Sequence, residues 1–262
     1  MSRVELSFVL PAYNEGDFIE GALDTLDRVV KETGLPYEIV VVDDGSMDST
    51  RLKAINYANK NGHVKVIGYN RNVGKGYAVK TGFMQAVGDA VFFVDSDLEI
   101  DLEEIPRYVE ALRHGDIVIA SKWHPESIVE MPLTRRILSH GFNVLVRLLT
   151  GVKLRDTQAG LKAIGRKAFG DVFPRLAVKR YAFDVELLAV ANLCGLKVVE
   201  MPINIKIRSL FNPMDVWRMF VDLLGITYRL RVLRWYQRSI HGPFRAQQLT
   251  GWAHGDTQDT SV

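Results

Sequence analysis

The stretch VFFVDSDLEID, residues 91–101, begins as an apolar run and ends in a cluster of acidic residues. Four carboxylates occupy every second position of its second half: Asp95, Asp97, Glu99 and Asp101. Like charges this close repel one another, and burying even part of them is costly. An apolar run without polar alternation is typical of a strand buried on both faces, as in a parallel sheet between two layers of helices. The stretch therefore predicts a central strand that ends in a charged site.

The composition is that of an ordinary folded protein. The 262 residues are 47% hydrophobic and 24% charged, and they include one cysteine, Cys194. A single cysteine excludes an internal disulfide and fits a reducing compartment. The apolar run before Pro11 is too short for a signal peptide, and no run of about 18 uncharged apolar residues predicts a membrane span. We therefore expect a soluble, intracellular, single-chain protein.

The net charge of +2 conceals an uneven distribution. Residues 203–245 contain eight Lys or Arg and two Asp, a net charge of +6, so the rest of the chain carries −4. Such a bias indicates a surface for an anionic partner: nucleic acid, a membrane or phosphate. No recognised RNA-binding signature accompanies the basic segment, so we expect no nucleic-acid partner.

Strands and helices alternate through the first half of the chain. Apolar runs predict strands at 6–10, 38–44, 64–69, 90–95 and 116–121. The segments between them carry apolar residues at helical spacing. This alternation predicts a doubly wound α/β domain with a mostly parallel sheet flanked by helices. Later segments predict helices at 135–149 and 183–194 and a strand at 159–165, and we expect the domain to span residues 1–212.

The C-terminal part predicts one basic amphipathic helix and a tail. Residues 213–238 place these apolar side chains on one face: Trp217, Phe220, Val221, Leu224, Tyr228, Val232 and Trp235. With Arg at the sides, this is the composition of a helix at a membrane interface. Packing on the domain or on a membrane-anchoring partner explains the pattern equally well, and residues 137–149 are a second interfacial candidate. We expect residues 239–262 to be a flexible tail.

Three of the predicted strands end in polar sequence. The first ends in PAYNE (11–15), the second in DDGS (43–46) and the fourth in DSDLE (95–99). In an open parallel sheet, ligands bind outside the carboxyl ends of the strands, so these segments are expected to meet at one edge. Oxygen ligands of this kind suit Mg²⁺ or Mn²⁺, which bridges a diphosphate. Helix capping by each Asp is the alternative, and it explains one cluster better than all three.

These segments also carry a family resemblance. PAYNE, VVDDGSMDST, NRNVGKGYAVKTG and FVDSDLEID, in this order, resemble family 2 glycosyltransferases of the GT-A fold over residues 4–210. The later DTQAGLKAI (156–164) and RYAFDVELLAVA (180–191) resemble the dolichyl-phosphate glucosyltransferase branch, with dolichyl-phosphate mannose synthases as relatives.

The resemblance implies an inverting, metal-dependent glycosyltransferase peripheral to the cytoplasmic face of a membrane. It would move a hexose from a nucleotide-sugar of the UDP-glucose or GDP-mannose type to a polyprenyl (dolichyl) phosphate. Two alternatives stay open: transfer to a glycan or small hydroxyl acceptor, and a non-catalytic nucleotide-sugar-binding protein.

The resemblance implies roles for individual residues as well. It places nucleotide-sugar binding at Pro11, Tyr13, Glu15, Asp43 and Asp95. The positions of Asp44, Lys75, Gln158 and Asp184 in the sequence add these four to the expected nucleotide-sugar site, although a plain helix start explains Lys75 equally well. Asp97 and Glu99 would hold the metal, Mg²⁺ or Mn²⁺. Lys122, Arg135 and Ser139 would meet the acceptor phosphate, and the expected catalytic residues are Asp97, Arg135 and Glu186.

The chemistry of the acceptor decides whether a catalytic base is needed. An attacking sugar hydroxyl must lose a proton, which requires a carboxylate beside it. A phosphate monoester is already anionic at neutral pH, so it needs only cations that gather the two negative partners and hold them in line. In this interpretation Asp184 and Glu186 contact the donor sugar and do not act as bases.

Overall fold

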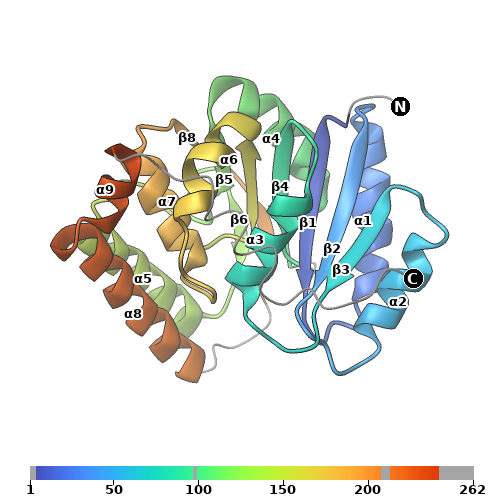
Figure 1. Cartoon of the computed structure of the whole chain (residues 1–262), viewed down its shortest axis with the longest axis horizontal. Helices are drawn as coiled ribbons and strands as arrows, with labels where there is room; N and C mark the ends of the chain where they lie inside the picture. Colours follow the sequence, from blue (N-terminus) through green and yellow to red (C-terminus); the bar gives the residue numbers. More distant parts are fainter. Residues whose placement is uncertain (1–3, 97–98, 208–212, 242–262) are drawn as a thin grey trace.

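A seven-stranded sheet forms the centre of the protein (Figure 1). The computed structural model describes residues 4–96, 99–207 and 213–241. The strands of the sheet are β1 (Leu6–Ala12), β2 (Tyr37–Asp43), β3 (Val64–Gly68), β4 (Ala90–Val94), β5 (Ile117–Ala120), β7 (Leu161–Gly165) and β8 (Val198–Met201). Their order is β3-β2-β1-β4-β7-β5-β8, and β7 alone runs antiparallel to its neighbours. The predicted mostly parallel α/β sheet is therefore confirmed.

Helices cover both faces of this sheet. They are α1 (Ile19–Glu32), α2 (Thr50–Ala58) and α4 (Ile105–Ala111) on one face, and α3 (Lys75–Gln85), α6 (Arg166–Val172) and α7 (Phe183–Leu193) on the other. Alternate side chains of each strand enter different cores, because successive residues of a strand point to opposite faces. Phe8 and Leu10 pack in the first core, whereas Val9 packs in the second. Burial on both faces explains the uninterrupted apolar runs of the sequence.

A second, two-stranded sheet was not predicted. It pairs β6 (Ile128–Glu130) with β9 (Asn204–Lys206) in parallel. Three residues are too few to show a strand periodicity, and both ends of β6 are exposed. The neighbouring Ile100 forms an isolated bridge with Ile205 of β9, which joins this small sheet to the segment after β4.

The predicted single helix over 213–238 is wrong. The structure has α8 (Pro213–Thr227), a π-helical turn (Tyr228–Val232) and α9 (Trp235–His241), with Arg234 at φ +48° before α9. Because the chain bends there, Tyr236 enters the core that contains α3 and α7 and is fully buried. The first residues of the expected tail, 239–241, belong to α9, and residues 242–262 lie outside the described part of the chain.

Helix α8 packs beside α5 (Leu133–Thr150), as Figure 1 shows. Leu223 and Ile226 of α8 are buried with Val146 of α5 and Val185 of α7. The segment after residue 213 is thus joined to the domain through two cores. None of the described helices has the length and apolar character needed to cross a membrane.

Two helical glycines allow a test of how closely α3 packs on the sheet. A Cβ at Gly82 of α3 would lie 2.3 Å from Val9 Cγ1 and 2.9 Å from Val42 Cγ2, whereas a Cβ at Gly21 of α1 would meet nothing within 4 Å. Gly82→Ala should therefore lower the free energy of unfolding by about 1–3 kcal/mol through overpacking. Gly21→Ala should raise it by about 0.5–1 kcal/mol through helix propensity. Urea denaturation of both variants measures the difference, and equal stabilisation by the two would contradict this packing.

Candidate active site

A cavity of about 200 Å³ opens at the carboxyl ends of β1, β2 and β4. Six of the predicted nucleotide-sugar residues line it: Pro11, Tyr13, Glu15, Asp44, Lys75 and Asp95. The sheet register explains this meeting, since Ala12 at the end of β1 pairs with Asp43 at the end of β2. Val9 pairs with Phe93, so the segment after β4 ends at the same edge. We call this space the first cavity.

Asp44 shapes the loop that precedes α3. Its carboxylate accepts hydrogen bonds from Val73 N (2.9 Å), Gly74 N (3.0 Å) and Asn72 Nδ2 (2.9 Å). Burial raises the pKa of Asp44 above its ordinary value, although the backbone hydrogen bonds from Val73 and Gly74 oppose the shift. Asp43 is also buried, accepts from the backbone N–H of Ser46, and is not among the residues lining the first cavity.

A second cavity of about 310 Å³ adjoins the first. The three residues predicted to meet the acceptor phosphate line it together: Lys122, Arg135 and Ser139. Glu99, Gln158 and Asp184 line it as well. Lys75, Asp95 and Tyr181 line both cavities, and Lys75 Nζ lies 2.6 Å from Asp95 Oδ1. The two cavities therefore meet at this ion pair.

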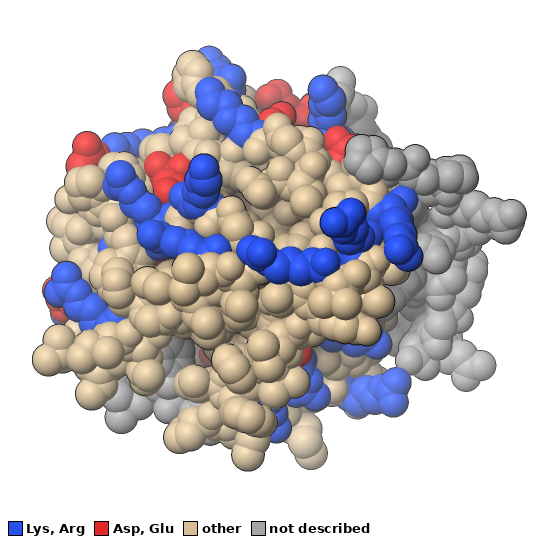
Figure 2. Space-filling view, turned by 90° about the vertical axis from the view of Figure 1, so that its left-hand side faces the viewer, with Lys and Arg blue, Asp and Glu red and all other residues tan. Residues whose placement is uncertain are grey.

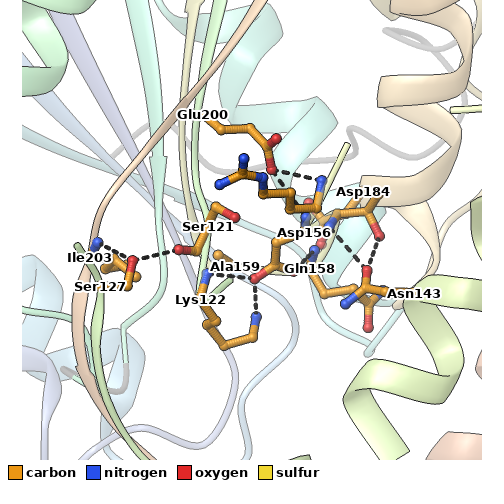
Figure 3. Close-up of polar contacts among 12 residues, drawn as sticks. Ser121, Lys122, Ser127, Asn143, Asp156, Gln158, Ala159, Asp184, Glu200 and Ile203 are labelled. Atoms are coloured by element: carbon orange, nitrogen blue, oxygen red, sulfur yellow. Dashed lines mark hydrogen bonds and ion pairs between the residues drawn. The ribbon is translucent and has the colours of Figure 1, made fainter. Parts of the chain in front are cut away.

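Lys122, which lines the second cavity, is held by the carboxylate of Asp156 (Figure 3). Its Nζ lies 2.7 Å from Oδ2 of the fully buried Asp156, and its backbone N–H donates to the same oxygen at 2.9 Å. Asp156 Oδ1 accepts from Gln158 N at 2.9 Å. Burial alone would raise the pKa of Asp156, but Lys122 and these hydrogen bonds outweigh it and hold the pKa below its ordinary value. One buried carboxylate thus fixes two residues of the cavity wall.

Asp184 has a similar partner, which the sequence analysis missed. Lys162 of β7 is buried, and its Nζ forms an ion pair with Asp184 Oδ1 at 2.9 Å. The same Nζ donates to the carbonyl of Ala159 at 2.5 Å. The signal in the sequence was a lysine within the apolar strand AGLKAIG, because a buried lysine needs a partner.

Gly160 is a second missed residue. A Cβ at this position would lie 1.8 Å from Asp95 Oδ2. The Gly160 carbonyl accepts a hydrogen bond from Asp95 N at 3.1 Å. The backbone of Gly160 is therefore close to both the backbone and the carboxylate of Asp95. Only a residue without a side chain allows this approach.

Glu186 lies away from both cavities. Its side chain is fully buried, and it accepts hydrogen bonds from the backbone N–H groups of Ala177 and Val178. It also contacts Arg229 and Tyr236 of the C-terminal segment. We therefore expect no direct contact between Glu186 and the sugar, in contrast to the sequence-based expectation. Burial of this kind depends on long-range packing that FDVEL alone does not reveal.

The predicted metal site is described only in part. Asp97, the expected metal ligand and catalytic residue, lies outside the described residues. Among the described residues no group of three or more His, Cys, Asp or Glu is arranged to hold a metal ion. Glu99 and Asp95, on either side of Asp97, both line the second cavity. Their carboxylates are the hard oxygen donors that Mg²⁺ or Mn²⁺ prefers. The chemical type of these described residues therefore suits such an ion.

Residues 7–173 match the family described as Glycosyl transferase family 2. The chain belongs to this family. The transferase is 36% identical over 260 residues to the dolichyl-phosphate beta-glucosyltransferase of Drosophila melanogaster, which covers 90% of this chain and 78% of that protein. It is 34% identical over 250 residues to the dolichyl-phosphate beta-glucosyltransferase of Homo sapiens, covering 88% of this chain and 77% of that one. The predicted family and glycosyltransferase class are confirmed.

The fold also has solved relatives. Glucosyl-3-phosphoglycerate synthase from Mycobacterium tuberculosis, in complex with Mn²⁺, UDP and glucosyl-3-phosphoglycerate, superposes with a TM-score of 0.64 at 20% identity. The match covers 86% of this transferase and 79% of that chain. At this identity the likeness concerns the fold, and it confirms the predicted GT-A architecture.

The close approach at Gly160 gives a test of the site. Gly160→Ala places a methyl group against the Asp95 carboxylate and should displace it from the junction of the two cavities. Because a shift of about 1 Å in a reacting group can cost about 10²-fold in rate, we expect a turnover loss of that order. Gly170→Ala in α6, where a Cβ meets nothing within 4 Å, is the matched control and should keep full activity. Equal glycosyl transfer by both variants, measured with labelled donor, would show that Asp95 tolerates displacement.

Proposed function

We propose that this transferase moves glucose, with inversion, from UDP-glucose to dolichyl phosphate. The acceptor and the sugar follow from the dolichyl-phosphate beta-glucosyltransferases that it resembles over most of its length. UDP-glucose is the first donor to test, because glucosyl-3-phosphoglycerate synthase, which shares the fold, has been solved with that donor. The first cavity would hold the nucleotide and the second the acceptor.

The lining of the second cavity is the observation that carries the acceptor assignment. Its cationic part contains Lys122 and Arg135. Its apolar lining includes Ile100, Met131, Ala159, Ile205, Ile207 and Met219. Four acidic residues line the same cavity: Asp95, Glu99, Asp184 and Asp215. A ligand with an anionic head and an apolar chain satisfies both parts, and a polyprenyl phosphate is such a ligand. A soluble glycan would leave this apolar lining in contact with water or sugar hydroxyls, which disfavours a hydroxyl acceptor.

The transfer needs one displacement. An oxygen of the lipid phosphate attacks C1 of the glucose and contributes the electron pair of the new bond. The bond from C1 to the diphosphate oxygen breaks, and its electron pair leaves with the nucleoside diphosphate. No proton has to move, since the acceptor is already ionised. This fits the carboxylates Asp95 and Asp184, which are each ion-paired with a lysine and are poorly placed to act as free bases.

The described residues supply position and charge for this step. Arg135 and Ser139 would hold the acceptor phosphate, with Lys122 beside them. Lys75, at the junction of the cavities, would balance charge between the two anionic partners. A divalent ion, Mg²⁺ or Mn²⁺, bound by Asp97 and Glu99 would neutralise the charge of the leaving diphosphate.

We further propose that the protein docks on the cytoplasmic face of a membrane through α5 and α8. These helices expose large apolar side chains: Leu133, Ile137, Leu138 and Leu148 on α5, and Trp217, Val221 and Leu224 on α8. Figure 2 shows the side of the molecule where α5, α8 and α9 lie, with a broad uncharged surface beside a row of Lys and Arg side chains. Arg135, Ser139 and Met219 of these helices line the second cavity, so a lipid would enter it from the membrane side.

The donor, acceptor and metal can be tested in one assay. With labelled UDP-glucose, dolichyl phosphate and Mg²⁺ or Mn²⁺, label should enter the extracted lipid, whereas labelled GDP-mannose should give none. Excess EDTA should abolish transfer and added metal should restore it. Arg135→Met should reduce turnover by about 10²-fold through loss of a charged donor. Arg136→Met, the adjacent residue of α5, does not line either cavity and should keep wild-type turnover.

Several outcomes would contradict parts of this proposal. Mannose transfer from GDP-mannose would show that the proposed donor is wrong. Full activity in excess EDTA would show that the reaction does not require a divalent metal. Label in a soluble glycan, with none in the lipid, would favour the hydroxyl-acceptor alternative.

Membrane docking predicts cosedimentation with anionic vesicles. Replacing both Leu148 and Trp217 by Glu places two charges in the apolar surface and should abolish it. Leu52→Glu is the matched control, because Leu52 lies on α2 at the opposite side of the molecule and is exposed to a similar degree. This substitution should leave cosedimentation unchanged. Salt should release part of the wild-type protein, since each Arg near an anionic surface contributes about 1 kcal/mol. Binding that is equal for all three proteins would place the membrane contact elsewhere, and no binding at all would indicate a membrane-anchoring partner.

A further inference from the structure

One wall of the first cavity is an irregular segment, residues 176–182, that joins the turn after α6 to α7. It carries Arg180 and Tyr181, which both line the cavity and were not among the predicted site residues. On one side this segment packs on the start of α3, where Tyr77 N–H donates to the Lys179 carbonyl at 3.0 Å. A Cβ at Gly74 would lie 2.6 Å from that same carbonyl oxygen, so the approach is close.

On its other side the segment is held by Glu186. One carboxylate oxygen, Oε2, accepts from two consecutive backbone N–H groups, Ala177 at 2.9 Å and Val178 at 2.8 Å. A segment without regular secondary structure has few other partners for its backbone N–H groups, and N–H groups that are partly shielded from water need such partners. The Glu186 side chain therefore replaces the hydrogen bonds that a helix or sheet would supply.

The other oxygen, Oε1, is held by the C-terminal segment Tyr228–His241. Tyr236 donates its hydroxyl proton to Oε1, and Arg229 Nη2 lies 3.3 Å from the same oxygen. Arg229 Nε in turn donates to the Tyr236 hydroxyl at 2.9 Å. Glu186 thus faces four donors, which suits a carboxylate because that group only accepts. Its two oxygens join the wall of the first cavity to residues more than forty positions away.

We propose that Glu186 is a positioning residue for donor binding, and that the segment Tyr228–His241 braces the 176–182 wall through it. Given the proposed function, Arg180 on that wall would meet the diphosphate of the donor. The brace makes the C-terminal segment part of the donor site, although none of its residues lines the first cavity.

The physical reason lies in the burial of Glu186. A buried carboxylate that loses its cationic partner is strongly unfavourable and either takes up a proton or draws water inward. Either change weakens the bonds to Ala177 and Val178, because a protonated oxygen accepts poorly and water competes for the N–H groups. The wall would then lose its fixed position, and Arg180 with it.

Arg229→Met tests this brace, with Arg231→Met as its matched control. Arg231 belongs to the same turn and donates to the carbonyls of Leu148 and Leu149. Within the described part of the chain, it forms no hydrogen bond with Glu186 or with residues 176–182. In the full-length, donor-free protein, amide hydrogen exchange of residues 177 and 178 should rise by about tenfold in Arg229→Met and stay at the wild-type rate in Arg231→Met. The dissociation constant for UDP, measured by calorimetry, should rise by about tenfold in Arg229→Met alone.

Two further variants guard against general loss of structure. Tyr236→Phe removes a single hydroxyl and should give a smaller change in the same direction, and Arg229→Lys should restore part of the UDP affinity. Affinity for a short prenyl phosphate should change less than that for UDP, since Arg180 lines the first cavity alone and only Tyr181 of this wall also lines the second.

Unchanged exchange of residues 177 and 178 in Arg229→Met and Tyr236→Phe would overturn the brace. Faster exchange with unchanged UDP affinity would overturn the positioning role of Glu186. Failure of the wild-type protein to bind UDP would instead contradict the proposed donor, because the exchange measurement is made without it.

Discussion

The ion pair between Lys75 and Asp95 lies where the two cavities meet, and the surrounding elements are placed around it. Asp95 follows β4, at the centre of the sheet, and Lys75 begins α3 on one face of that sheet. Gly160, immediately before β7, leaves room for the carboxylate. Because β7 runs antiparallel beside β4, its first residues arrive at the same edge where the parallel strands end. In the proposed reaction, a donor and an acceptor would therefore approach one another across a single carboxylate.

Buried ion pairs fix the residues that surround this junction. Asp156 holds Lys122, Lys162 holds Asp184, and Glu186 is held by Arg229. Desolvation offsets much of the attraction within such pairs, so they are weak evidence for stability. Here each pair joins segments that are distant in the sequence and ends at or beneath a cavity wall. We interpret them as devices that set the positions of the polar groups around the substrates.

The two cavities differ in a way that matches two kinds of substrate. The first is lined mainly by polar residues, and the second combines charged residues of both signs with several apolar side chains, among them Ile205 of the small sheet and Met219 of α8. Its wall continues into α5 and α8, whose outer faces are apolar. Part of the second cavity's wall and the apolar surface proposed for membrane docking thus belong to the same two helices. In the proposed arrangement a lipid acceptor would reach the junction without leaving the membrane surface entirely.

The sequence by itself determined the sheet, the edge at which the site lies and most of its polar residues. Apolar runs, helical spacing and the polar ends of strands are local patterns, and parallel strands bring their carboxyl ends together whatever the details of packing. Only the tertiary structure decided which acids reach the cavities: Asp44 does, whereas Asp43 and Glu186 are buried behind the walls. It also decided the break before α9, since burial of Tyr236 beside Glu186 outweighs the amphipathic pattern that predicted one helix. These outcomes depend on contacts between distant segments, and no local pattern contains them.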